Sequence, residues 1–477
     1  MNVKSELEYN KKAIKAILGS DDVIFFDFEA GDKAAFCVYV DSITDKELLG
    51  LEVIAPLTKA DASKSILNLS KRITLANIKT IDKINDAAQE VLNGNTAIFI
   101  DGKKKAVTVD LKKFEVRAIS EPPTGLAVRG PRNGFTESIK SNLSLVRRYL
   151  KSSDLKVENF EKGQYTHTSI AFVYIDGIAR PEIIDKVREK IKAINVDGIP
   201  DSSYVAKLLS ERKTSLFKQV GSTERPDVLI ERMLEGRVGI IVDGSPFALT
   251  LPYLLIEDFQ AAEDYYISQY RANLVRALRV VAMIFSILLP AVFVAAQLFH
   301  LQIIPLNFLL TIVNGIKEIP FSPSLEMFFV LLIFELLNET SVRMPKYVGM
   351  ALAVVGALVL GETAVNAGIV STPAILIMAL SGISIYAIPE IVETTSVLRF
   401  VYLLIAGSLG GYGLIALTAF IVLYLASADN YGAPYLAPYS PVLLNDFQDG
   451  LYMNNVIGMV RRPASLGSKN KIRQKLK

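Results

Sequence analysis

Five long apolar segments follow one another in the second half of the chain, between Val280 and Ala426. An apolar run of about 18 or more residues can cross the hydrocarbon core of a bilayer as a helix, and several in succession exceed what one soluble core uses. The segments are 280–299, 325–337, 347–361, 369–389 and 400–426. We therefore predict an all-α polytopic transmembrane domain over 261–430, followed by a basic cytoplasmic tail over 431–477.

The charges that flank the apolar segments predict the side on which each end of the domain lies. Three arginines precede the first segment, and a basic run from Arg461 to Lys477 ends the tail. The three arginines are Arg271, Arg276 and Arg279. Because basic flanks favour the cytoplasm, both ends are expected there and the number of crossings should be even. Five segments conflict with this unless one is re-entrant or the last bends at Gly410-Gly411 and returns, so four, five or six crossings stay open.

The region before the first apolar segment contains an internal repeat. Residues 35–49 match 170–184, and residues 95–111 match 237–252, in the same order and at similar separation. Recurrence by chance is the alternative, and the shared order of the two matches disfavours it. Each second match holds an Asp-Gly pair, the strongest short signal for a β-hairpin. The pairs are Asp101-Gly102 and Asp243-Gly244.

This repeat predicts an α/β soluble N-terminal region of two similar subdomains. We place the first over 1–120 and the second over 155–260, joined by a linker over 121–154. The polar N-terminus is unlike a signal peptide, so we expect the soluble region in the cytoplasm.

Cysteine, histidine and motif content exclude several classes of function. The single cysteine, Cys37, forms no internal disulfide and is expected in a buried strand, while two histidines far apart cannot make a zinc site of the usual ligand count. The sequence has no GxxxxGK[ST], GxGxxG, HExxH or GxSxG motif. We expect no catalytic residue, cofactor, metal or nucleic-acid partner, and hence no enzyme.

The predicted linker contains an amphipathic helix and an arginine-bearing loop. One face of the helix is apolar, with Phe135, Ile139, Leu143, Val146 and Leu150, whereas Arg147 and Arg148 are expected on other faces. In the preceding loop, Arg129 and Arg132 flank the rigid turn Gly130-Pro131 and could face an acidic partner or a lipid phosphate. Ion pairs with Glu121, with Glu137 or with a neighbouring subunit are the favoured alternative.

A second polar cluster lies at 222–227, where Glu224, Arg225 and Asp227 are expected in a turn. Arg225 is placed to bridge elements of the domain. A purely structural role is the favoured interpretation here too.

Ionisable residues within the apolar segments are few. Glu335, Glu339 and Arg343 follow at i, i+4 and i+8 on one helical stripe. Burying such a group in the membrane costs a few kcal/mol of free energy unless it is paired or hydrated. We therefore expect these side chains to face the protein interior or an aqueous path. A simple interfacial salt bridge between Glu339 and Arg343 is the alternative.

Small residues recur every four positions in the third apolar segment, at Gly349, Ala353, Ala357 and Gly361. This face permits close helix packing or a narrow pore lining. Glu362 and Asn366 lie at its end, and a ring of Glu362 from several subunits would make a cation-selective mouth. We therefore expect a homo-oligomer with 347–366 nearest its axis, in which Glu362 and then Glu335 control ion passage.

Several motifs together resemble one family. They are VRGPRNGFTES (128–138), TERPD (223–227), EDYY (263–266), VRMP (342–345) and YGAPYLAPYSP (431–441). Over residues 20 to 445 the chain resembles the A subunit of GerA-type spore germination receptors. It departs from the family pattern at Gly125, at 214–220 and at Asn338-Glu339. These departures affect the details of local ion pairs and not the resemblance to the family.

The resemblance implies a membrane subunit of a nutrient germinant receptor in the spore inner membrane. Its implied partners are membrane lipid, a polytopic B subunit that senses nutrient and a lipoprotein C subunit, with A subunits oligomerising into a nutrient-gated cation channel. A relative encoded with the SpoVA channel proteins, a transporter and a non-conducting scaffold stay open as alternatives.

Overall fold

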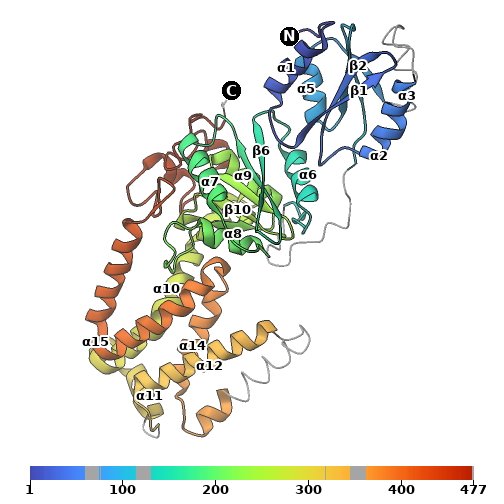
Figure 1. Cartoon of the computed structure of the whole chain (residues 1–477). Helices are drawn as coiled ribbons and strands as arrows, with labels where there is room; N and C mark the ends of the chain where they lie inside the picture. Colours follow the sequence, from blue (N-terminus) through green and yellow to red (C-terminus); the bar gives the residue numbers. More distant parts are fainter. Residues whose placement is uncertain are drawn as a thin grey trace.

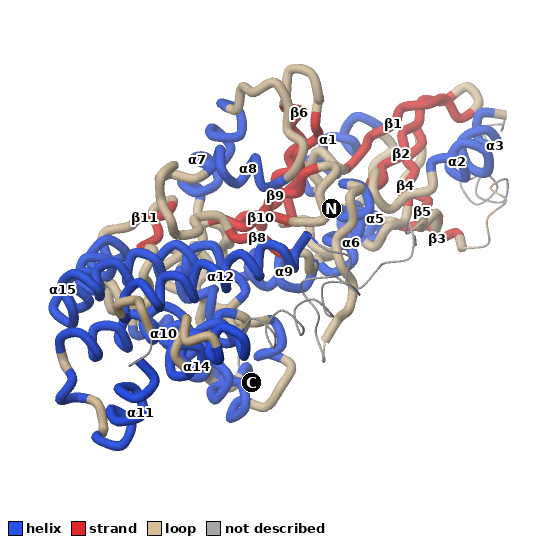
Figure 2. Tube along the Cα trace, turned by 90° about the horizontal axis from the view of Figure 1, so that it is seen from below, coloured by secondary structure: helices blue, strands red, loops and turns tan. Residues whose placement is uncertain are grey.

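The computed structural model describes residues 1–59, 73, 75, 77–113, 130–316, 319–343 and 361–474. Two α/β units form one end of the molecule and a group of long helices forms the other (Figures 1 and 2). An α/β N-terminal region followed by a helical part is therefore confirmed.

The first unit has one antiparallel five-stranded sheet in the order β1-β2-β4-β5-β3. Its strands are β1 (Val23–Ala30), β2 (Lys33–Val40), β3 (Ile78–Ile81), β4 (Thr96–Ile100) and β5 (Ala106–Val109). Alternate residues of β2 enter two cores, because successive side chains of a strand point to opposite faces. Phe36 and Val38 pack with α1 (Leu7–Ile17) and α5 (Ile84–Leu92).

The other face of this sheet is covered by a short helical run after β2. This run comprises α2 (Lys46–Leu48), the π-helical turn η1 (Leu49–Ile54) and α3 (Ala55–Thr58). Cys37 packs on this side with Leu49, Val53 and Leu57, and its side chain is fully buried. The expectation of a buried strand cysteine is confirmed, and burial raises the pKa of its thiol to about 12.

The second unit repeats this build. Its sheet has the order β6-β7-β9-β10-β8. The strands are β6 (Leu155–Lys162), β7 (Thr168–Ile175), β8 (Gly221–Thr223), β9 (Val238–Val242) and β10 (Ala248–Leu251). Helices α7 (Pro181–Ala193) and α8 (Ser202–Leu209) cover one face, and α6 (Ile139–Tyr149) and α9 (Pro226–Glu235) cover the other.

The predicted repeat is therefore confirmed at the level of topology. Strands β2 and β7 occupy the same second position of their sheets, and both Asp-Gly pairs connect adjacent antiparallel strands. Helix α6 precedes β6 as α1 precedes β1, so the helix expected in the linker packs on the second sheet.

The helical part begins with α10 (Gln269–Phe299) and ends with α15 (Val392–Ala426). Between them lie α11 (Leu306–Ile316), α12 (Pro323–Arg343) and α14 (Thr372–Ile385). These helices share one apolar core that includes Val294, Met327 and Met378. Two described stretches are long and apolar enough to cross a membrane, Gln269–Phe299 and Pro389–Ala426.

Helix α15 bends at Gly410, which was one of the alternatives that the sequence left open. Gly410 has φ 60° and ψ −146°, a conformation that only glycine adopts readily. A Cβ atom at this position would lie 2.7 Å from the Phe299 ring at the end of α10. The glycine thus permits both the bend and the close approach of α10. Of the third apolar segment, 347–361, only Gly361 is described; the polytopic crossing pattern stays a prediction.

Candidate functional site

A buried ion pair joins two helices of the apolar part. The Arg399 Nη2 atom on α15 lies 2.6 Å from the Glu335 Oε1 atom on α12, and the Arg399 side chain is fully buried. Glu335 also accepts a hydrogen bond from the Ser396 Oγ atom at 3.3 Å. An isolated charge would be strongly unfavourable in this apolar setting, so each partner stabilises the other.

Two serines extend this pair to the remaining long helices. Arg399 Nη1 donates to Ser381 Oγ on α14 at 3.4 Å, and Ser381 Oγ donates to the Ser286 carbonyl on α10 at 2.8 Å. Both serines are buried. We call Glu335, Arg399, Ser381 and Ser286 the four-helix polar chain. It connects α12, α15, α14 and α10 through polar atoms that are buried except for the partly exposed Glu335 carboxylate, so a shift of one helix disturbs the contacts of the others.

The expected stripe of Glu335, Glu339 and Arg343 lies on α12, but its members have separate roles. Glu335 contacts α15, whereas Arg343 Nε donates to Glu339 Oε1 at 2.8 Å on the exposed face. The local Glu339–Arg343 pair is thus present. Arg399 was not singled out in the sequence, because its partner is 64 residues away. An arginine directly before the last apolar segment is the signal that could have found it.

The predicted pore residues are only partly described. Glu362 and Asn366 are exposed in the helical residues that the structure describes from Gly361 onward. Among the described atoms, nothing lies within 4 Å of a Cβ built on Gly361. Ala353 and Ala357 lie outside the described residues, so the small-residue face as a whole stays a prediction.

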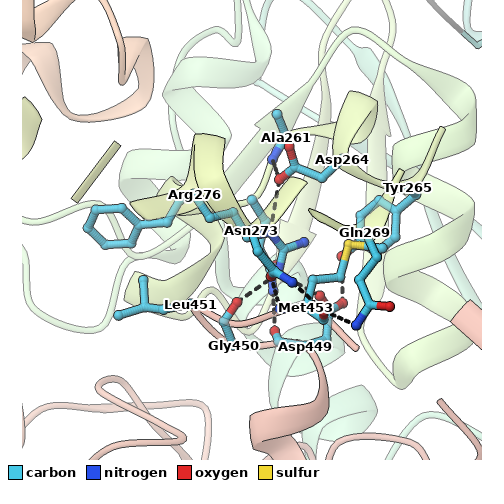
Figure 3. A network of polar contacts seen from close by, with 12 residues as sticks. Ala261, Asp264, Tyr265, Gln269, Asn273, Arg276, Asp449, Gly450, Leu451 and Met453 are labelled. Carbon is cyan, nitrogen blue, oxygen red and sulfur yellow. Dashed lines mark hydrogen bonds and ion pairs between the residues drawn. The ribbon is translucent and has the colours of Figure 1, made fainter. Parts of the chain in front are cut away.

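A polar network joins the start of α10 to the segment that connects it with the second α/β unit and to the tail (Figure 3). At its centre is Arg276 of α10, which is fully buried. Its Nε donates to Asp264 Oδ2 at 3.0 Å, and its Nη1 donates to Asp449 Oδ1 at 2.8 Å and to the Gly450 carbonyl at 2.7 Å. Arg279 also donates to Asp264 Oδ2, at 2.7 Å. We call Asp264, Arg276, Arg279 and Asp449 the junction network.

The tail beyond α15 is bound to α10 by further contacts of this region. Asn273 Nδ2 donates to the Met453 carbonyl at 3.0 Å, and the Met453 backbone N–H donates to Asn273 Oδ1 at 2.6 Å (Figure 3). Tyr265 donates to Asp449 Oδ2 at 2.5 Å. The start of α10 and the tail therefore lie on the same side of the helical part, and Arg276, first noted as a flanking charge, is an internal ion-pair partner.

A buried carboxyl group lies close to this junction, just after β10. The Asp258 side chain accepts a hydrogen bond from the Tyr253 hydroxyl. Burial raises the pKa of Asp258 to about 7. The hydrogen bond from Tyr253 and the attraction to Lys218 lower this pKa and offset part of the effect of burial. Lys218 in turn pairs with Glu390, which lies in the turn before α15. This carboxyl group therefore titrates where the α/β unit meets a candidate span.

Three of the sequence motifs meet at one tyrosine. Tyr266 of EDYY donates to Asp227 Oδ2 at 3.0 Å, and Asp227 Oδ2 also binds Arg225 Nη2 at 2.7 Å within TERPD. A Cβ on Gly130, which has φ +113°, would lie 2.8 Å from the Tyr266 ring. Arg225 is the residue before α9, and Pro226 occupies the first turn of that helix, where its missing N–H is harmless.

The remaining predicted ion-pair residues are placed as follows. Glu224 is buried, and its carbonyl accepts the Phe135 N–H at 2.7 Å, which ties TERPD to the loop before α6. Arg132 is exposed beside the turn at Gly130. Arg129 lies outside the described residues.

Arg147 was expected on a polar face of its helix and is instead one of the most buried residues. Its Nη2 lies 2.7 Å from Asp22 Oδ1, and its Nε donates to Asp22 Oδ2 at 2.7 Å. Nη2 also donates to the Leu155 carbonyl at 3.2 Å. The expectation was wrong because Asp22 belongs to the first α/β unit, so this bidentate pair connects the two units.

Comparison with known proteins identifies the family. The model of the Bacillus/Clostridium GerA spore germination protein family matches residues 9–465. This chain is a member of the GerA family. Spore germination protein KA of Bacillus subtilis (strain 168) is 35% identical over 472 residues, covering 96% of this chain and 86% of that protein. Spore germination protein B1 of the same organism is 29% identical, covering 100% of both chains.

A solved structure also matches the GerA-family chain. It is the crystal structure of the N-terminal domain of the A subunit of the Bacillus megaterium spore germinant receptor GerK3, with 30% sequence identity and a TM-score of 0.43. The match covers 54% of this chain and 98% of that domain. The resemblance to A subunits of GerA-type receptors noted in the sequence is confirmed, and a role in spore germination follows from the family.

Proposed function

We propose that this chain is the A subunit of a nutrient germinant receptor and that its oligomer opens a cation path across the spore inner membrane. The observation that supports this most is the four-helix polar chain, because buried ionisable groups in apolar helices are rarely kept without a role. In this proposal the chain has no catalytic activity, and it works with polytopic B and lipoprotein C subunits.

The Glu335–Arg399 pair would act as a latch rather than as a pore lining. Glu335 keeps 21% of its side chain exposed while Arg399 keeps none, so the carboxylate is the partner that water can reach. Hydration of Glu335 would weaken the attraction to Arg399 and free α12 to move relative to α15. Glu362, which is exposed in the described chain, is the better candidate for a mouth that attracts cations.

The junction network supports coupling between the soluble units and the candidate spans. Arg276 and Arg279 of α10 bind Asp264, and Asp449 of the tail binds Arg276, so both chain ends of the helical part are tied to one place. Asp227 of the second α/β unit binds Tyr266, two residues after Asp264, so a displacement of this unit would be passed to α10. The same arrangement supports an even number of crossings, because the start of α10 and the tail lie on the same side of the helical part.

Single-channel recording of the purified receptor in planar bilayers tests the proposal. The wild-type complex of A, B and C subunits should pass cation current when nutrient is added. Glu362→Gln should lower the conductance, while Glu362→Asp, which keeps the charge, should preserve it. A correctly assembled complex that passes no current under any nutrient condition that triggers spores would contradict the channel and favour a scaffold.

A further inference from the structure

The segment that follows α15 folds back across the ends of both candidate spans. Leu436 packs against the cluster that contains Leu425 near the end of α15. Leu443 packs against a second cluster, which is also contacted by Val280 and Met283 at the start of the apolar part of α10. Figure 1 shows this segment beside the upper end of α15. The loop of residues 436–445, which makes both contacts, therefore lies at the level where the apolar helices leave the proposed membrane.

This loop presents apolar side chains outward. Val442 is 67% exposed and Leu444 is 81% exposed, and their neighbours Pro441 and Asn445 are exposed as well. The sequence has no charged residue from Asn430 to Asn445. Scattered exposed apolar residues are ordinary on a soluble surface. An uncharged loop that exposes them beside the ends of two candidate spans is a different situation, because the bilayer interface would lie at this level.

We propose that Val442 and Leu444 insert into the interfacial layer of the lipid bilayer and hold the tail on the membrane surface. The proposal rests on the membrane location of α10 and α15 in the proposed function. Apolar side chains that lie in the interface reach roughly 5–10 Å into the boundary between headgroups and acyl chains. Lipid is favoured over a protein partner because the loop packs, through Leu436 and Leu443, at the ends of α10 and α15, the two candidate spans.

The position of the loop gives this contact a mechanical consequence. Leu444 is the first residue of a short 3₁₀ turn, η6 (Leu444–Gln448). Asp449 and Gly450, which bind Arg276, directly follow this turn. A loop held in the interface would keep the junction network at a constant height above the bilayer. The second α/β unit, which contributes to the same region, would then be oriented by the membrane as well as by α10.

The absence of tryptophan from this chain makes the test direct. Leu444→Trp places a single fluorophore in the loop, and Val442→Trp provides a second probe if the first does not fold. Tyr165→Trp is the matched control, because Tyr165 is also 81% exposed but lies in the loop after β6. Ile415→Trp, at a position on α15 that is 71% exposed, reports on the candidate span itself. Each full-length variant is reconstituted in liposomes of phosphatidylcholine or of its brominated form.

We expect bromolipid to quench most of the emission of Leu444→Trp and Ile415→Trp and to leave Tyr165→Trp unchanged. Quenching of Ile415→Trp without quenching of Leu444→Trp and Val442→Trp would overturn the interfacial contact and leave the proposed function standing. An emission of Leu444→Trp that shifts to shorter wavelength without quenching would assign the loop to a protein partner. Loss of quenching at Ile415→Trp would instead contradict the membrane location on which the proposal rests.

Discussion

Arg399 of α15 and Glu335 of α12 form an ion pair of 2.6 Å in which the arginine side chain is wholly buried and the carboxylate is partly exposed. The two partners are therefore unequal. Removing the carboxylate leaves a buried cation, whereas removing the arginine leaves a carboxylate that water can still solvate. This asymmetry makes the pair suitable as a latch and allows a direct test.

Glu335→Gln should lower the free energy of unfolding by roughly 3 kcal/mol, because Arg399 loses its charged partner in an apolar setting. The double variant Glu335→Gln with Arg399→Met should recover most of this loss. Thermal unfolding of the purified full-length chain in detergent measures both. Glu339→Gln is the control: its pair with Arg343 is exposed, so we expect a change below about 1 kcal/mol. Equal effects of Glu335→Gln and Glu339→Gln would argue against a buried latch.

Asp22→Asn should weaken the connection between the two α/β units. The carboxylate of Asp22 and the guanidinium of Arg147 are both buried, so neutralising one leaves the other unpaired at a cost of roughly 3 kcal/mol. Calorimetry should show a lower unfolding temperature. Asp27→Asn removes a pair with Lys11 in which Asp27 is 67% exposed, and it should shift the free energy of unfolding by less than about 0.5 kcal/mol. The interpretation fails if Asp22→Asn is as mild as this control.

Stability should fall as the pH rises toward neutrality, with Asp258 as a contributor. Its pKa in the folded chain is about 7, above the ordinary value near 3.9, so the folded state alone binds the proton between these values. Linkage then lowers the free energy of unfolding by up to about 1.4 kcal/mol per pH unit in this window. Asp258→Asn keeps an acceptor for Tyr253 and should flatten the profile, whereas Asp197→Asn, at an exposed site, should leave it unchanged.

Gly410→Ala should disturb the bend of α15, because alanine disfavours the glycine conformation by about 2 kcal/mol and its Cβ meets Phe299. Gly361→Ala meets no described atom within 4 Å and should leave the isolated chain as stable as before. Detergent-solubilised unfolding compares the two. If Gly361→Ala keeps stability but lowers subunit cross-linking, the small-residue face lies against another copy; unchanged assembly would count against that arrangement.

Glu362→Gln should slow early monovalent cation release after nutrient addition in spores that contain normal amounts of the protein. A carboxylate ring attracts cations by a Coulomb interaction that a narrow passage screens only partly. Glu362→Asp serves as the charge-preserving control. Release at the parental rate from Glu362→Gln spores would mean that cations pass elsewhere.

The features that were predicted correctly depend on short stretches of sequence. Apolar strands and Asp-Gly turns are local signals, and their repetition in the same order was enough to predict two sheets with equivalent β2 and β7 strands. The bend at Gly410 was one of two alternatives that the sequence left open, because a pair of glycines inside a long apolar segment is a local signal of altered backbone geometry.

The predictions about charged residues were less successful. Arg147 has a helical position that looks polar, but Asp22, 125 residues earlier, draws it into the interior. In the sequence Arg276 looks like a charge that flanks the first apolar segment. In the structure the tail returns to the start of α10 and places Asp449 beside Arg276. A sequence shows how many charges a chain holds, but not which of them are compensated.

The sequence by itself thus determined the two-sheet repeat, the apolar character of the helical part and the family, because each follows from residues close together or from motifs in order. Only the tertiary structure decided that Glu335 faces Arg399 and that α10 and the tail share Arg276. The physical reason is that the energy of an ion pair depends on the distance and the solvent around both partners. Both are set by packing between distant segments.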